Sequence, residues 1–364
     1  MAKRLLLVAV LLALATGAGA LDGANGHTTT EVLSVEDVTE DLPEWDLPLF
    51  WFGNDNFVAG KPHHEIAVDG SGKIYVVVAG WDPDGDGYLG AATTGVVSAD
   101  GSTLETVQSS SFGYNSAGTV FTSSWQAVVI ADFSNDLVDD GDLLLVRSIS
   151  DYSNNSGSVE VYVLPADGSD DPELIFELTD TRTPWQADLV AAADGTLFLR
   201  GFGVHRLDYA SGAYSGDRVL GHDLSSNFAM VLGPDGYLYG HLNIPNDKTI
   251  YRVDPDGLDS YEAFATAQYY SSQTSGLAFD AKDKLWVATF HKKKTPRNYL
   301  AKMNKKGKFP WRKRIAEWGY DGTSGYEGMR TLLTGGDGEL YAVVYDFENG
   351  LSVPEMRHSI WRID

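Results

Sequence analysis

A short apolar run, an Asp-Gly turn and a second run of bulky β-forming residues recur along this chain. The clearest copy is Val231–Gly240, and Thr249–Gly257 continues it with a further strand-like segment that ends in another Asp-Gly turn. Apolar runs separated by Asp-Gly turns are typical of antiparallel strands joined by tight hairpins. The pattern therefore predicts three consecutive antiparallel strands within residues 231–257.

The second strand of this unit occurs six times. Its copies are Gly72–Tyr75, Gly141–Leu144, Gly195–Phe198, Gly236–Tyr239, Asp283–Trp286 and Gly338–Tyr341, which lie 41 to 69 residues apart. A third-strand element recurs as Arg206–Asp208, Arg252–Asp254, Lys302–Asn304 and Arg362–Asp364, with weaker copies that end at Gly101 and Gly168. Uneven spacing suits propeller blades whose loops differ in length. We predict an all-β fold, a six-bladed β-propeller over residues 63–364.

The sixth blade shows only three strand-like segments, so another part of the chain has to supply its outermost strand. The alternation of apolar and polar residues in Thr29–Val35 predicts a strand of suitable length before the first blade. We expect this N-terminal strand to close the ring, because an unpaired sheet edge promotes aggregation. The aromatic run Pro48–Phe52 is the competing candidate for the same strand, or a plug over the ring.

The first twenty residues have the features of a secretory signal. Lys3 and Arg4 precede an apolar run from Leu5 to Ala15, and Ala18–Ala20 offers a cleavage site of small residues. This assignment leaves residues 21–62 as an N-terminal segment that contains the ring-closing strand. We expect a secreted product, extracellular or periplasmic, without a membrane span, because this apolar run is too short to cross a bilayer and the sequence has no other such stretch.

The chain carries a net charge of −24, which disfavours binding to nucleic acid. His291–Arg314 is the exception, with eleven Lys or Arg and no acid. We expect the basic fifth blade to bind an anionic glycan or another copy of the chain, through Lys292, Lys293, Lys294, Arg297, Lys305, Lys306, Lys308, Arg312, Lys313 and Arg314. An acidic rim of Asp-Gly turns could receive this blade in a homo-oligomer, and a contact between unlike surfaces would propagate into rings or filaments.

One acidic loop has the first half of a calcium-binding pattern. Asp82, Asp84 and Asp86 alternate and are followed by a glycine, so their carboxylates could converge on one cation. The second half departs from the pattern, because Thr93 stands where a bidentate acid is required. Bound calcium and an empty acidic turn both remain open.

Several residues are expected at the mouth of the central channel, where the inner strands begin. They are His64, Glu65 and Asn227, together with the repeated pairs Trp125-Gln126 and Trp185-Gln186. The favoured interpretation is that these side chains satisfy buried backbone groups and line a wet channel. A catalytic centre is the alternative.

The alternation of apolar strand, Asp-x-x-Gly turn, strand and Arg-Val-Asp segment resembles the six-bladed propellers of the NHL and SMP-30/gluconolactonase superfamily. For gluconolactonase-like members the resemblance implies a divalent metal in the channel, held by Glu, Asn and Asp, with a carboxylate as base. Glu65 and Asn227 match two such ligands, but Gln126 and Gln186 stand where Asn or Asp is expected, and neutral amides bind divalent cations more weakly. His64 is a candidate general base.

No phosphate-binding loop, dinucleotide fingerprint or nucleophile elbow is present in the sequence. We therefore expect a secreted, non-enzymatic binding or assembly propeller that uses blade 5 as its interaction surface. The alternative is a metal-dependent hydrolase or lactonase-like enzyme with its site at the channel mouth.

Overall fold

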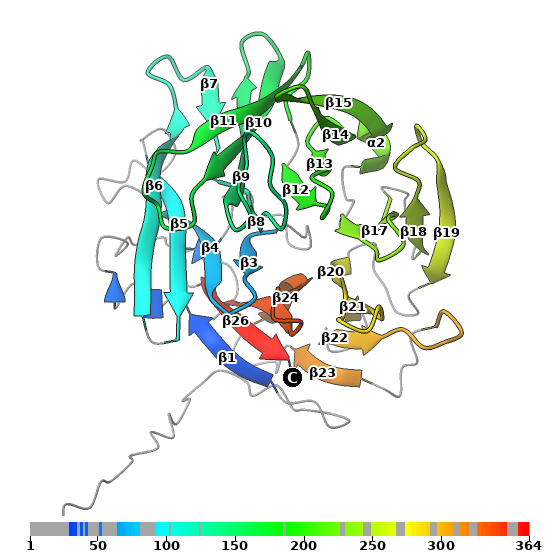
Figure 1. Cartoon of the computed structure of the whole chain (residues 1–364). Helices are drawn as coiled ribbons and strands as arrows, with labels where there is room; N and C mark the ends of the chain where they lie inside the picture. The colour runs from blue at the N-terminus through cyan, green and yellow to red at the C-terminus, as the bar shows by residue number, and fades with distance from the viewer. Residues whose placement is uncertain are drawn as a thin grey trace, which may run out of the picture.

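A computed structural model shows six antiparallel blades arranged as a ring (Figure 1). It describes residues 29–34, 37–38, 41–42, 51–52, 64–80, 92–101, 103–123, 125–184, 187–225, 230–242, 249–266, 274–291, 297–308, 314–319, 326–347 and 356–363. Helix contributes little, and α2 spans only His222–Ser225. In this part of the chain no helix has the length and apolar character needed to cross a bilayer. The all-β six-bladed propeller predicted from the repeat is thus confirmed.

The first two blades are joined into one continuous sheet. Blade 1 contains β3 (Ile66–Val68), β4 (Ile74–Gly80), β5 (Ala92–Asp100) and β6 (Thr103–Tyr114), and blade 2 contains β8 (Ala127–Ile130), β9 (Leu143–Asp151), β10 (Ser156–Leu164) and β11 (Glu173–Asp180). The short strand β7 (Val120–Thr122) pairs with β6 on one side and with β9 on the other. Because β7 bridges both blades, their backbones are hydrogen-bonded directly to each other.

The next three blades are separate four-stranded sheets. Blade 3 contains β12 (Asp188–Ala191), β13 (Leu197–Arg200), β14 (Val204–Ala210) and β15 (Ala213–Leu220), blade 4 contains β16 (Val231–Leu232), β17 (Leu238–Gly240), β18 (Thr249–Val253) and β19 (Tyr261–Thr266), and blade 5 contains β20 (Thr274–Phe279), β21 (Leu285–His291), β22 (Arg297–Lys302) and β23 (Arg314–Gly319). In each of them the strands pair in chain order. Sequential antiparallel pairing is what the recurring hairpin turns predict.

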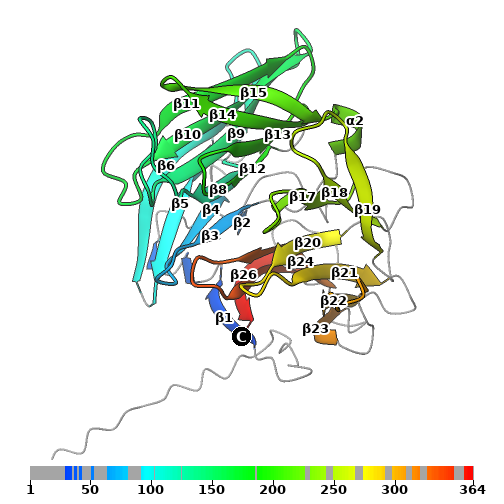
Figure 2. The same cartoon turned by 45° about the vertical axis from the view of Figure 1, so that its right-hand side comes forward.

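Blade 6 is completed by the N-terminal strand. It contains β24 (Tyr326–Thr334), β25 (Leu340–Phe347) and β26 (Met356–Ile363), with β1 (Thr29–Ser34) as its outermost strand. The β1 strand pairs antiparallel with β26, from Thr29 opposite Ile363 to Ser34 opposite Ser359. Figures 1 and 2 both show blue β1 alongside red β26. This pairing confirms the predicted closure of the ring by Thr29–Val35.

The aromatic run that was the other candidate for the ring-closing strand lies in a different blade. Within Pro48–Phe52, β2 (Trp51–Phe52) pairs with β4, with Trp51 opposite Ala79 and Phe52 opposite Val78. Strand β3 also pairs with β4, at its earlier residues Ile74–Val76. The aromatic run therefore extends the inner edge of blade 1 and does not close the ring.

The recurring glycine has a conformational cause. In blades 1 to 4 and 6 it opens the hairpin from the first strand to the second, with φ between 81° and 94° at Gly72, Gly141, Gly195, Gly236 and Gly338. Glycine adopts such left-handed values without a steric penalty. Blade 5 places Asp283 at this position, with φ of 57°. The backbone bonds are equivalent too, since Gly236 donates to the carbonyl of Gly233 and Asp283 donates to that of Asp280.

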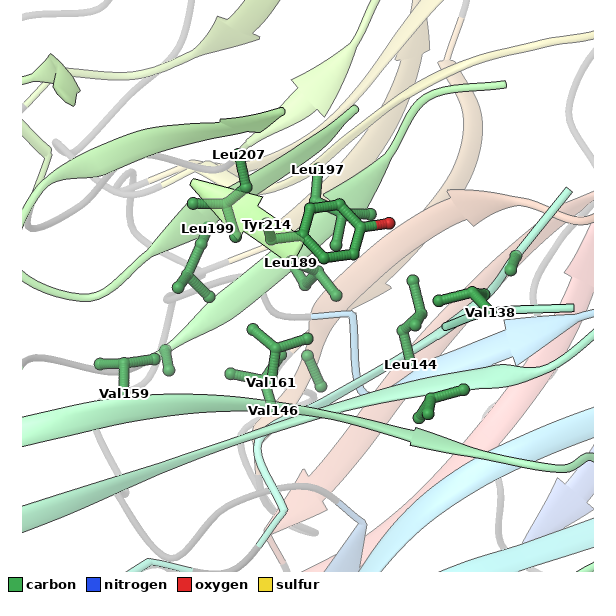
Figure 3. Close-up of a cluster of buried hydrophobic side chains, with 14 of the residues drawn as sticks. Val138, Leu144, Val146, Val159, Val161, Leu189, Leu197, Leu199, Leu207 and Tyr214 are labelled. Carbon is green, nitrogen blue, oxygen red and sulfur yellow. The ribbon is translucent and has the colours of Figure 1, made fainter. Parts of the chain in front are cut away.

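Buried side chains between adjacent blades form the core. Figure 3 shows Leu144, Val146, Val159 and Val161 of blade 2 facing leucines of blade 3. These leucines are Leu189, Leu197, Leu199 and Leu207, and all eight side chains are buried. Each full burial of a Val or Leu contributes about 1.5–3 kcal/mol. The blades are therefore held together mainly by apolar contact between their faces.

Candidate functional site

His64 lies at the mouth of the central channel, directly before β3. Its side chain is 24% exposed and lines a cavity of about 700 Å³ that the inner strands of all six blades enclose. We call this side of the ring the mouth face, because the inner strands begin here. The opposite side is the turn face, where turns join the first strand of a blade to the second and the third to the fourth.

A buried carboxylate fixes the imidazole of His64. Oδ1 of Asp188, in blade 3, lies 2.8 Å from Nδ1 of His64 and accepts the backbone N–H of the same residue at 3.1 Å. Leu189 donates its N–H to this oxygen as well, at 3.0 Å. Asp188 is 1% exposed, so His64 of blade 1 is anchored to the interior of blade 3 across the channel mouth.

Arg200 stands behind Asp188. The guanidinium is 3% exposed and lies 3.7 Å from Oδ2 of Asp188, its cross-strand neighbour in the β12–β13 pair. Burial lowers the pKa of Arg200, and the carboxylate of Asp188 opposes that shift. The pair therefore holds one negative and one positive charge out of water, with His64 on its channel side.

Three other residues that we expected at the channel mouth point into the protein interior instead. Glu65 is fully buried, and Oε1 accepts a hydrogen bond from the Thr331 hydroxyl at 2.9 Å. Gln126 is 2% exposed, and its side-chain oxygen accepts the N–H of Ala187 at 2.7 Å, which links blades 2 and 3. Trp125 lies in the core between blades 1 and 2, where its indole N–H donates to Gln108. None of the three lines the cavity.

Part of the expected basic surface is described. Lys305, Lys306 and Lys308 are exposed on the turn that follows β22, at the turn face. The backbones of Arg297 and Arg314 begin β22 and β23, respectively. The remaining predicted site residues lie outside the described residues, namely Asp82, Asp84, Asp86, Trp185, Gln186, Asn227, Lys292, Lys293, Lys294, Arg312 and Lys313. The proposed calcium loop therefore stays a prediction.

Metal ligands are not grouped in the described part of the chain. There, no three His, Cys, Asp or Glu side chains lie close enough together to hold one metal ion. His64 and Glu65 are adjacent in sequence, but their side chains contact different blades, through Asp188 and Thr331 respectively.

The repeat itself builds a local cluster on the turn face that sequence reasoning did not foresee. In blade 5, Oδ2 of Asp280 accepts the indole N–H of Trp286 at 2.9 Å and Nζ of Lys302 at 2.6 Å. In blade 6 the Tyr341 hydroxyl donates to Asp337 at 2.6 Å. Burial opposes ionisation of Asp280, but hydrogen bonds from Lys302, Trp286 and the turn backbone outweigh it and lower its pKa. This cluster thus serves folding. It joins the Asp of the turn to the aromatic residue of the second strand and to the cation of the third strand.

Comparisons with known proteins find distant structural similarity alone. The chain matches no known family and no curated protein. Among solved structures, it is similar to a protein of unknown function from Bacteroides thetaiotaomicron, at 12% identity over 93% of this chain and 76% of that one, with a TM-score of 0.46.

Two enzymes are among the other similar structures. The GH93 α-L-arabinofuranosidase of Fusarium graminearum matches at 10% identity over 86% of this chain and 97% of its own, with a TM-score of 0.48. The aldose sugar dehydrogenase of Streptomyces coelicolor matches at 13% identity over 86% and 98%, with a TM-score of 0.32. Similarity at this level carries no argument about activity. The sheet topology itself makes the chain a six-bladed β-propeller, as its resemblance to the NHL and SMP-30/gluconolactonase propellers implies.

Proposed function

We propose that this protein is an exported, non-enzymatic assembly module whose copies associate through oppositely charged turns of blades 5 and 2. The observation that carries the proposal is the placement of a basic and an acidic patch on the same face of the ring. Each patch is built from two turns.

The basic patch consists of Lys282, Lys284, Lys305, Lys306 and Lys308, all exposed on blade 5. Two of these lysines belong to the turn between β20 and β21, and three belong to the turn after β22. The turns lie side by side, because the N–H of Met303 donates to the carbonyl of Leu285 at 2.8 Å. Five ammonium groups therefore share one edge of the turn face.

Little of this positive charge is neutralised locally. The carboxylate of Asp280 is occupied by Lys302, Trp286 and the backbone of its own turn. Asp283 is the other acid in the two turns. Within the described residues, none of the five lysines of the basic patch forms an ion pair. The patch is thus available to an anionic partner.

The acidic patch lies on the turn face of blade 2. Residues 131–142 and 165–172 form its two turns, which contain no Lys or Arg and eight aspartates, namely Asp132, Asp136, Asp139, Asp140, Asp142, Asp167, Asp170 and Asp171. Burial raises the pKa of Asp142, a hydrogen bond from the backbone N–H of Asp139 opposes this rise, and repulsion from the charges of Asp139 and Asp167 adds to it. Because Asp139 and Asp167 belong to different turns, their common effect shows that like charges crowd here. A docked cation would relieve this repulsion.

A second copy of the protein can neutralise the charge of both patches at the same time. Blades 2 and 5 stand across the ring from each other (Figure 1). When two copies meet turn face to turn face, a two-fold axis perpendicular to the channel brings each basic patch over the partner's acidic patch. The two contacts are then equivalent, and the pair is closed. This arrangement favours a dimer over the rings or filaments that an unlike contact would build.

The test is the solution mass at low and high ionic strength, measured by analytical ultracentrifugation. We expect a dimer at about 30 mM salt and a monomer at about 500 mM, because screening shortens the range of exposed charges to a few ångströms. Lys305→Glu with Lys306→Glu should give a monomer at low salt. Asp170→Lys with Asp171→Lys should do the same, and the chain that carries all four changes should regain the dimer.

A control matched to the Asp170 and Asp171 variant keeps its change in net charge but moves it away from the patches. Glu177→Lys with Asp217→Lys reverses two exposed acids on outer strands and should leave the dimer intact. A monomer at every salt concentration that binds dextran sulfate through the same lysines would contradict self-association and favour an anionic polysaccharide. A salt-independent monomer that ignores dextran sulfate would contradict the assembly function altogether.

A further inference from the structure

The central channel has the size and wall chemistry of a small-molecule site. Its volume of about 700 Å³ lies within the range of about 300–1,000 Å³ that is usual for such sites. Apolar residues from the inner strand of every blade contribute to the wall, and those that are partly exposed include Ile130, Ala191, Leu232 and Phe279 of blades 2 to 5. A ligand there would exchange water for apolar surface along this part of the wall.

Polar groups are placed at the two ends of the channel. The turn-face end carries Asp69, Asp132 and Asp140, and the mouth end carries His64. The carboxylate of Asp69 is already occupied by the backbone of its own turn and by the Ser71 hydroxyl. Asp132 and Asp140 are exposed to solvent. His64 is thus the polar side chain that stands where the apolar wall reaches the mouth.

The hydrogen bond to Asp188 fixes which nitrogen of His64 is offered to the channel. An ionised carboxylate only accepts hydrogen bonds, so Nδ1 of His64 must carry the proton that it donates at 2.8 Å. In a neutral imidazole this leaves Nε2 as an acceptor. Among the described residues Nε2 has no hydrogen-bond partner. Because Asp188 is itself held by Arg200, the ring is fixed before any ligand arrives.

We infer that the channel binds a small, uncharged, largely apolar ligand with one hydroxyl or N–H donor, and that Nε2 of His64 receives this donor. An uncharged ligand fits because the carboxylates of the lining stand at the turn-face end, away from His64, and burial of an unpaired ion among the apolar side chains between the two ends is costly. Asp188 and Arg200 are positioning residues, because they orient His64 and do not line the cavity. This site does not depend on the assembly proposed above.

A matched pair of probes isolates the hydrogen bond. 2-Naphthol has an apolar body with a hydroxyl donor, and 2-methoxynaphthalene has the same body without the donor. In calorimetric titrations we expect the wild-type protein to bind 2-naphthol about five- to tenfold more tightly than 2-methoxynaphthalene, because one hydrogen bond usually contributes this much. His64→Phe should bind both probes with equal affinity. His222→Phe, the same exchange outside the cavity, should keep the wild-type preference.

A second measurement needs no variant. In ¹H–¹⁵N spectra of wild-type protein, the Nε2 resonance of His64 should move on addition of 2-naphthol and stay in place with 2-methoxynaphthalene. The inference is overturned if neither probe binds up to its solubility limit. It is equally overturned if His64→Phe keeps the preference for 2-naphthol, or if the Nε2 resonance of bound wild-type protein does not respond to the donor.

Discussion

At the scale of single residues, a few buried polar side chains join the blades. Asp188 of blade 3 holds His64 of blade 1, and Gln126 of blade 2 accepts the N–H of Ala187. Another buried polar residue, His205 in β14, lies opposite Arg218 of β15 and is only 9% exposed. Burial first, and then the positive charge of Arg218, lowers the pKa of His205 to about 4, although Asp180 opposes the shift.

The lowered pKa of His205 predicts a loss of stability on mild acidification. The unfolded chain binds the proton below about pH 6.5, and the folded protein binds it only below about pH 4. Stability therefore falls as the pH drops through this window, by on the order of 2 kcal/mol from this residue. We expect the free energy of unfolding of His205→Gln, measured in urea, to change less with pH between pH 7 and pH 4.5 than that of the wild type. A slope equal to that of the wild type would contradict this origin.

At the scale of single elements, the hairpin from the first strand to the second explains the repeat. Its Asp accepts backbone N–H groups of the turn, as Asp280 does from Lys282 and Lys284, and the residue two positions before the second strand adopts a positive φ. Both requirements are local, so the sequence reveals them directly. Blade 2 departs from this pattern, because its loop of residues 131–142 is longer and carries the acidic patch.

The positive φ predicts opposite outcomes for two substitutions. Gly236 has φ of 81° with open space around it, so Gly236→Ala should cost about 1–2 kcal/mol through the backbone alone. Asp283 in blade 5 already bears this strain, and Asp283→Gly should stabilise the protein by a few tenths to about 1 kcal/mol. The free energy of unfolding in urea measures both. Destabilisation by Asp283→Gly would show that its side chain matters more than its backbone.

Other elements could not be found from the sequence, because they depend on contacts between distant segments. Strand β7 exists because β6 and β9 run on either side of it, and three residues carry no pattern of their own. For the candidate site, the sequence placed His64 at the channel mouth but did not reveal its partner 124 residues away. One signal was present, since Asp188 begins and Arg200 ends a strand that is otherwise apolar.

At the scale of the whole molecule, the ring depends on the pairing of β1 with β26. Leu33 of β1 is 3% exposed and packs into a core with Ile66 of blade 1 and Ile360 of blade 6. The alternating pattern of Thr29–Val35 predicted this strand, because a half-buried strand needs apolar residues on one face. Its exact register, with an irregularity between Glu31 and Leu33, depends on β26 and could not be read from the segment alone.

The closing strand gives a prediction about global stability. Leu33→Ala should lower the free energy of unfolding by about 2–4 kcal/mol, because it removes buried apolar surface and leaves a cavity at the closure. Thr30→Ala, an exposed change in the same strand, should stay within about 0.5 kcal/mol of the wild type. Equal effects of the two changes in urea unfolding would show that β1 is not integral to the ring.

The pairing of β1 with β26 also sets the order of events during synthesis. The strand made first can find its partner only after all six blades have been made, so sheets form early while the ring stays open. Until then β1 and the outer edge of β26 are both unpaired, which is the condition that favours association between incomplete chains. Closure between such distant segments is also slow, because the long chain between them must first be ordered. The exposed interval before closure is thus a built-in feature of this topology.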